Sequence, residues 1–210
     1  HELKTPLAIT RSSLENLSSK NLDGESRQFL QRAQEGVDRQ FAIVRAMSEA
    51  SRLEASFAVA EWQIIDPGAL VQRCVEAYRS LHQGRVLVAK IPAEEKQLRC
   101  APDLLVQALD KLVDNAVSFS SAQDEVTVGI RWGDRNCVLY VRNTGSRLPD
   151  DLKDRLFDSL VSLRERGGAV PHLGLGLYIV RLVAEVHEGI ACAKNLPESD
   201  GVEFRISIPR

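Results

Sequence analysis

Apolar side chains recur at helical spacing through residues 1–55. Two rows of residues follow alternating steps of three and four: Leu3, Leu7, Thr10, Leu14, Leu17 and Leu30, Ala33, Val37, Gln40, Val44, Met47. Residues 18–26 between them are rich in Ser, Asn, Asp and Gly, which favours a turn. One apolar stripe on each of two helices does not make a complete core. We therefore expect a helical hairpin that pairs with a second copy into a four-helix bundle. The alternative is a hairpin that packs on the rest of the chain.

The pattern changes after Ser56. Alternating apolar positions predict strands over 61–66, 86–91, 126–132, 137–143, 190–196 and 202–208. Helical spacing predicts helices that start at Asp66-Pro67 and that cover 103–118, 150–160 and 176–187. This order indicates an α+β protein in which helices cover one face of a mixed sheet. The predicted domains are therefore a hairpin over 1–56 and an α/β sandwich over 57–210.

Composition narrows the class of protein. The 210 residues are 44% apolar and 27% charged, as in a soluble globular protein, and no apolar run approaches 18 residues. A net charge of −2 gives no reason to expect nucleic acid or an anionic membrane surface as a partner. The four cysteines are scattered, which is typical of reduced thiols in a cytoplasmic protein. Because the chain opens on His1 without a methionine, we interpret it as a fragment whose membrane segments, if any, lie outside it.

Five short motifs occur in order along the chain. They are HELKTP (1–6), DKLVDNAVSFS (110–120), VRNTGSRLP (141–149), RLFDSLVS (155–162) and HLGLGLYIVRLVAEVHEG (172–189). In this order and at these spacings they resemble the sensor histidine kinase family over essentially the whole chain. The resemblance implies a dimerisation hairpin followed by a GHKL (Bergerat) ATP-binding domain. It also implies a full-length protein in the bacterial inner membrane.

The same resemblance implies an activity and partners. Such a kinase uses ATP and Mg²⁺ to phosphorylate its own histidine, then passes the phosphoryl group to an aspartate of a response regulator receiver domain. It is also expected to dephosphorylate that regulator. The partners implied are a second copy of the chain and the receiver domain, with no nucleic acid.

His1 is the candidate phosphoryl acceptor. A lone histidine is most often structural, but the HELKTP motif on a dimerising helix resembles the phosphoacceptor motif of the family. The neutral imidazole is abundant near pH 7, and Glu2 can accept its other ring proton. Thr5 lies four residues on, on the same helical face, and the resemblance implies that it positions a water for dephosphorylation.

Asn115 and two glycines are candidates for ATP and metal binding. Alone, Asn115 would be a surface amide, but the resemblance makes its oxygen a ligand of the Mg²⁺ that bridges ATP phosphates. Gly174 and Gly176 precede a predicted helix, so backbone there can approach a phosphate. The dinucleotide fingerprint is absent because Ile179 stands where its third glycine would be. The preceding residues 164–172 resemble the ATP lid of the family.

The resemblance also assigns nucleotide contacts to Asn143, Gly145, Phe157, Leu175 and Leu177. In the family an aspartate accepts a hydrogen bond from the adenine amino group, and here that position is Asn143. An asparagine carbonyl can still accept this bond, although the strength given by a charge is lost.

Other positions depart from the family pattern. An asparagine of the family is replaced here by Lys111, and two of its glycines are replaced by Arg147 and His172. Ser118 stands where a lysine is common. These departures leave open a degenerate kinase that binds ATP weakly and acts mainly as a regulator-binding phosphatase. A third reading, a GHKL ATPase that is not a kinase, is opposed by HELKTP and the heptad hairpin.

Overall fold

The computed structural model describes residues 3–145, 147–149, 155–158, 175–197 and 201–210. The chain falls into two compact units that divide between Ala55 and Ser56.

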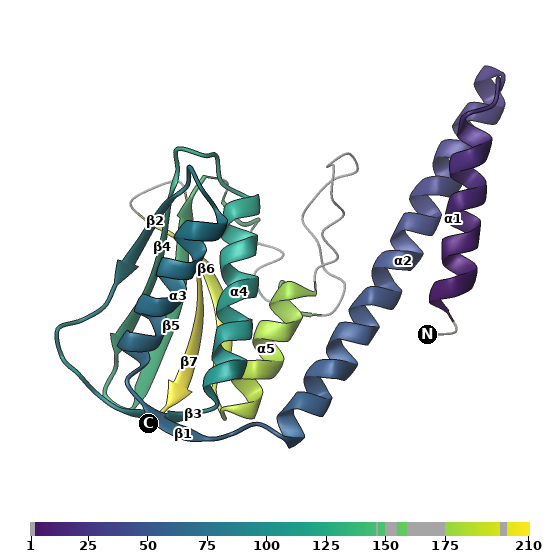
Figure 1. Ribbon diagram of the computed structural model, residues 1–210. Helices are drawn as coiled ribbons and strands as arrows, with labels where there is room; N and C mark the ends of the chain where they lie inside the picture. The colour runs from purple at the N-terminus through teal and green to yellow at the C-terminus, as the bar shows by residue number, and fades with distance from the viewer. Residues whose placement is uncertain (1–2, 146, 150–154, 159–174, 198–200) are drawn as a thin grey trace. The chain divides into compact units, whose positions relative to one another are not determined.

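The first unit is an antiparallel helical hairpin of α1 (Lys4–Ser18) and α2 (Gly24–Ala58), drawn in purple and blue in Figure 1, and the end of α2 from Ser56 belongs to the second unit. The turn between them ends at Asp23, whose carboxylate accepts a hydrogen bond from the Ser26 N–H (2.7 Å). This is an N-capping bond, which satisfies one of the free amides at the start of α2. The predicted hairpin is therefore confirmed.

The apolar row of α2 differs in part from the predicted one. Leu30 and Val37 are buried, as expected, whereas the predicted seam positions Ala33, Gln40 and Met47 are exposed. The covered row within one hairpin instead runs through Leu30, Gln34, Val37, Phe41, Val44 and Ser48. In α1, Leu7 and Leu14 are half-buried and Leu3, Thr10 and Leu17 are exposed. Within one hairpin, each helix covers a narrower strip of the other's surface than the full apolar pattern of the sequence provides.

The second unit contains a five-stranded mixed sheet in the order β2-β4-β5-β7-β6. Its strands are β2 (Val86–Lys90), β4 (Glu125–Trp132), β5 (Asn136–Thr144), β6 (Ile190–Asn195) and β7 (Gly201–Pro209). β2 and β4 run parallel, and the other neighbours are antiparallel. A separate two-stranded sheet pairs β1 (Gln63–Ile65) with β3 (Leu98–Cys100).

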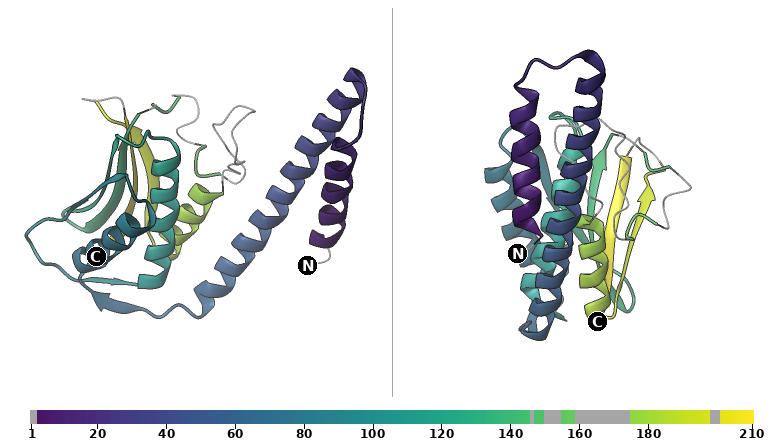
Figure 2. Two further views of the ribbon diagram at one scale, coloured as in Figure 1. Left: turned by 45° about the horizontal axis from the view of Figure 1, so that its top comes forward. Right: turned by 90° about the vertical axis from the view of Figure 1, so that its right-hand side faces the viewer.

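Three helices cover one face of the large sheet, as Figures 1 and 2 show. They are α3 (Pro67–Leu81), α4 (Pro102–Ser118) and α5 (Gly176–Val186). The Asp66 carboxylate caps α3 by accepting from the amides of Gly68 (2.8 Å) and Ala69 (3.2 Å), as the Asp-Pro pair predicts. Leu105, Leu109 and Leu112 of α4 are fully buried. The predicted α/β sandwich is thus confirmed.

The two faces of the sheet follow from strand alternation. On β4, Val126, Val128 and Ile130 lie on the face that the helices cover. Thr127, Gly129 and Arg131 lie on the opposite, outer face. We use the term outer face for that side below.

The structure differs from the predicted elements in two places. β3 had no predicted counterpart, because its three residues include only one large apolar side chain, Leu98. Of the short helix predicted over 150–160, the described part is a turn, in which the Asp158 N–H donates to the Arg155 carbonyl (3.0 Å).

Candidate functional site

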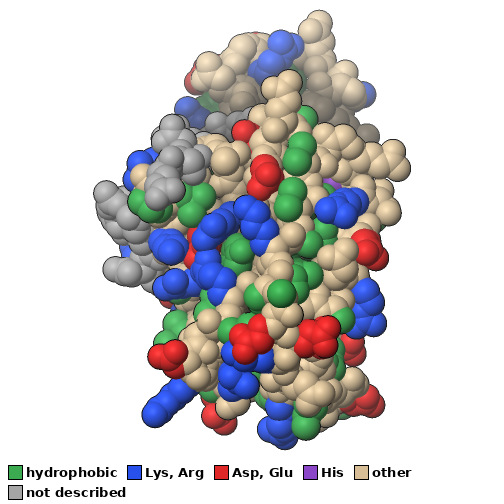
Figure 3. Space-filling model, turned by 90° about the vertical axis from the view of Figure 1, so that its left-hand side faces the viewer, with side chains coloured by type: hydrophobic (Ala, Val, Ile, Leu, Met, Phe, Trp, Pro, Cys, Tyr) green, Lys and Arg blue, Asp and Glu red, His purple; other side chains and the backbone are tan. Residues whose placement is uncertain are grey.

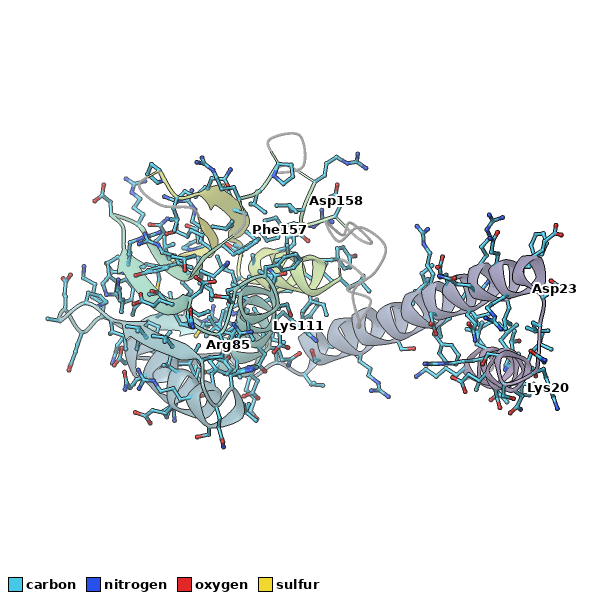
Figure 4. All side chains as sticks on the ribbon, turned by 90° about the horizontal axis from the view of Figure 1, so that it is seen from above. Lys20, Asp23, Arg85, Lys111, Phe157 and Asp158 are labelled. Carbon is cyan, nitrogen blue, oxygen red and sulfur yellow. The ribbon has the colours of Figure 1, made fainter. Side chains whose placement is uncertain are left out.

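The described segments that carry the candidate site residues adjoin one face of α4. Lys111, Asn115 and Phe119 follow at steps of four, so they lie on successive turns of the same side. A Cβ placed on Gly176 would lie 3.8 Å from the Cβ of Lys111, so the start of α5 adjoins Lys111. Figure 4 shows Lys111 where α4 and α5 meet. Asn115 is half-exposed one turn further on.

At the other end of this face, Gly145 adjoins the last turn of α4. A Cβ on Gly145 would lie 3.1 Å from the carbonyl oxygen of Phe119. Gly145 also has φ of 122°, a left-handed conformation that side chains rarely adopt. The close approach of backbone to backbone here therefore requires a glycine. Asn115 thus lies on α4 between the turn that adjoins Gly176 and the turn that adjoins Gly145.

Asn143 lies near the end of β5, on the face that the helices cover. It pairs with Val126 of β4 and Val202 of β7 and is only 2% exposed. Its amide nitrogen donates to the Thr144 carbonyl (3.0 Å). An aspartate at this position would place a carboxylate oxygen opposite the Thr144 carbonyl oxygen, and both of these groups are acceptors. The NH₂ group of Asn143 is therefore engaged by the backbone.

At the start of α5 the N-cap Leu175 makes no side-chain hydrogen bond, and the first turn contains no acidic residue. The amides of a first helical turn and the dipole of the helix both favour an anion. Leu175 and Leu177 are both buried to 9% exposure, so it is their backbone that can face a ligand.

Phe157 lies in the turn over 155–158. It is 5% exposed, and its ring meets Phe204 of β7 edge-on with centroids 6.4 Å apart. The neighbouring Asp158 forms an ion pair with Arg181 of α5 (2.9 Å). Phe157 is therefore a core residue that fixes this turn against α5 and the sheet.

Some predicted site residues lie outside the described ranges. These are His1, Glu2 and Gly174, together with the predicted lid over 164–172. Thr5 is described and is exposed on α1. In the described part of the chain, no group of three or more His, Cys, Asp or Glu side chains could hold a metal ion.

Sequence reasoning missed the contacts that hold the segment after β5. Asn195 of β6 accepts from the Leu148 N–H (2.7 Å) and donates to the Leu148 carbonyl (3.0 Å). The two residues are 47 positions apart, so no local pattern shows the pair. Arg147 beside them is exposed.

Two family models match the chain in the order of its two units. Residues 1–56 match the His Kinase A (phospho-acceptor) domain, and residues 100–210 match the histidine kinase-, DNA gyrase B-, and HSP90-like ATPase. The chain belongs to the sensor histidine kinases. The family resemblance that the five motifs indicated is confirmed.

Named relatives agree with this assignment. The kinase is 28% identical to the sensor protein ChvG of Rhizobium meliloti over its whole length, which is 39% of ChvG. It is 30% identical to the sensor protein CreC of Escherichia coli K12 over 94% of its own length and 41% of CreC. The chain therefore spans about two fifths of these curated relatives.

A solved structure shares the fold. Full-length ShkA in complex with AMPPNP matches all of this chain and 44% of its own, with a TM-score of 0.67 and 22% identity. In the described ranges, no helix of the kinase is long and apolar enough to cross a membrane.

Proposed function

We propose that this kinase transfers the γ-phosphoryl group of ATP to His1 and then to an aspartate of a response regulator receiver domain. The observation that carries the proposal is the alignment on α4. Asn115 lies between the start of α5 and the Gly145 turn, in a chain whose first 56 residues match a phospho-acceptor domain.

The arrangement supports one orientation of the nucleotide. The adenine would lie by Asn143 and Gly145, where the amide oxygen of Asn143 would accept from the adenine amino group. The phosphates would lie at the start of α5, where the amides of the first turn and the neighbouring Lys111 favour negative charge. That ShkA was solved with AMPPNP supports nucleotide binding by this fold.

The donor set near the phosphates fits Mg²⁺. The amide oxygen of Asn115 is a hard ligand, and Mg²⁺ usually takes few protein ligands beside phosphates and water. When bound, the ion supplies charge that stabilises the transferring group. Lys111 would add a fixed positive charge on the same side of α4.

His1 and its neighbours would carry the chemistry. A ring nitrogen of His1 attacks the γ-phosphorus, so an N–P bond forms as the bond to the bridging oxygen of ADP breaks. Glu2 accepts the other ring proton and holds the tautomer. Thr5, exposed on α1, would orient the water that hydrolyses the phosphorylated regulator.

The two-helix unit supports the proposed homodimer. α1 contains no buried residue, and Met47, Leu3 and Leu17 are exposed, which leaves apolar surface for a second hairpin. The full-length protein would reach the membrane through segments other than these, with this part in the cytoplasm.

Incubation with γ-labelled ATP and Mg²⁺ tests the proposal. We expect acid-labile label on the protein, typical of phosphohistidine, and none on His1→Gln, which should bind ATP as the parent does. Undiminished acid-labile label in His1→Gln would remove His1 from the reaction. Rapid ATP turnover without label would indicate an ATPase. Regulator dephosphorylation without label or ATP binding would indicate a degenerate kinase.

A further inference from the structure

A group of charged side chains lies on the outer face of the sheet, away from the helices. It consists of Arg131 of β4, Arg142 of β5, Glu203 and Arg205 of β7, and Lys194 of β6; we call it the basic cluster. The register places Glu203 directly between Arg142 and Lys194 on the neighbouring strands. Arg205 lies one row further along, between Tyr140 and Cys192. The cluster therefore spans four adjacent strands.

Glu203 is the centre of the cluster and is completely buried. Arg131 binds it with both terminal nitrogens, at 2.9 and 2.7 Å. Arg142 donates from Nε at 2.5 Å, and Lys194 lies 3.6 Å away. Two arginines thus satisfy the buried carboxylate, and the cluster holds more cations than this carboxylate requires.

The arginines are held in fixed positions. Arg131 and Arg142 both lie over the ring of Tyr140, with guanidinium carbons 4.2 and 4.8 Å from the ring centroid. Gly129 lies opposite Tyr140 and leaves room for it, because a Cβ on Gly129 would lie 2.6 Å from the tyrosine hydroxyl. Side chains that are already ordered lose little conformational entropy when they bind a partner.

The cluster is a local excess of positive charge on an acidic protein. Three of its four cations, Arg131, Arg142 and Lys194, pair with the one carboxylate, whereas the whole chain has a net charge of −2. Arg131, Arg142 and Lys194 remain 36%, 33% and 48% exposed. Figure 3 shows a face of the molecule where Lys and Arg side chains gather, with Asp and Glu mainly outside the group. The described helices of this unit lie on the other side of the sheet.

We propose that the basic cluster docks an acidic segment of a partner protein. Planar guanidinium groups at fixed positions suit carboxylates, which they bind through paired hydrogen bonds. Recognition of an anionic lipid surface instead typically uses Lys and Arg clustered on an amphipathic helix or beside a membrane helix, and a nucleic acid would favour a basic stripe on a basic domain. The cluster has one lysine beside three arginines, so it matches the protein partner better.

Binding of fluorescein-labelled octaglutamate, measured by anisotropy at low salt, tests this proposal on the whole chain. The test variant is Lys194→Glu with Arg205→Glu, because it keeps both arginines that satisfy Glu203. The control is Lys20→Glu with Arg73→Glu, which makes the same change of charge at exposed positions elsewhere. We expect the parent and the control to bind, and the test variant to bind roughly ten-fold more weakly.

Several results would overturn the proposal. Equal weakening in both double variants would show that only net charge matters. Absence of binding in the parent would show that no such surface exists. Binding to phosphatidylglycerol vesicles but not to the peptide would assign the cluster to lipid. Thermal unfolding of each variant, followed by circular dichroism, confirms that a loss of binding is not a loss of fold.

Discussion

Replacing Glu203 with glutamine should destabilise the second unit of the kinase. The substitution keeps the size of the side chain but removes the charge that Arg131 and Arg142 share. Both guanidinium groups would then face an amide, whose NH₂ group meets them as another donor. Breaking a buried pair from one side is costly, because it leaves the other charges without a partner.

The pKa of Glu203 gives the size of the effect. Burial alone raises this pKa, but the hydrogen bonds and charges of Arg131 and Arg142 outweigh burial and lower it from 4.5 to about 2. That difference corresponds to about 3 kcal/mol of stability at neutral pH. Because both arginines keep about a third of their surface in water, screening makes this an upper bound. We expect Glu203→Gln to lower the unfolding free energy at pH 7 by about 2–3 kcal/mol.

The sign of the pH dependence follows from the lowered pKa. The contribution of Glu203 is complete above pH 4.5 and disappears as pH falls toward 2. The difference between parent and variant should therefore shrink by about 1.4 kcal/mol between pH 7 and pH 3.5. Urea unfolding followed by tryptophan fluorescence measures it, because both tryptophans, Trp62 and Trp132, lie in this unit.

Glu125→Gln is the matched control. Glu125 lies on β4, which β5 separates from β7, is 47% exposed, and has Lys90 at 4.0 Å. Exposed pairs of this kind contribute about 0–1 kcal/mol, so the control should unfold nearly as the parent does. Equal stability of Glu203→Gln and the parent, or a difference that does not change with pH, would refute this account of the cluster.

Three further predictions concern the site and its support. Asn115→Ala should abolish Mg²⁺-dependent ATP binding, and calorimetry that gives equal affinity for variant and parent would contradict the metal assignment. Asn143→Asp should lower stability by about 1–2 kcal/mol and leave ATP binding no tighter, because a buried carboxylate would face the Thr144 carbonyl; several-fold tighter binding at unchanged stability would oppose this. Burial lowers the pKa of His187, whose Nε2 accepts from the Ala101 N–H (3.0 Å), so stability should fall as pH drops below about 6.5. His187→Phe should be less stable but should lose this pH slope, and an unchanged slope in urea titrations would assign it to another group.

Local patterns predicted the elements but not every contact between them. The five strands of the large sheet and the helices α3, α4 and α5 follow from apolar spacing and from the Asp66 cap. Within one hairpin α1 covers Gln34 and Phe41, each one position after a predicted seam residue, and leaves Ala33, Gln40 and Met47 exposed. The sequence does not show which of these adjacent rows faces α1. That a second copy covers the three exposed positions stays a prediction.

The site was predicted by motif, while its geometry was not. Asn115, Asn143 and Gly145 were named from the sequence, but their relation depends on packing between α4 and β5. The bond from Asn143 to the Thr144 carbonyl shows that the amide is built into the strand end. The basic cluster had no sequence signal at all. Its members come from four strands, and only the sheet register brings Glu203 beside Arg131, 72 positions earlier.

The hairpin has a sparse core, so its folding should depend on the concentration of the protein. Among its described side chains, only Leu30 and Val37 are buried, so a lone hairpin has little to offset its chain entropy. In the proposed homodimer, folding and pairing would form a single equilibrium governed by mass action. Each ten-fold dilution would then remove about 1.4 kcal/mol from the paired state. The copy number of the kinase in the cell would set the fraction of molecules able to signal.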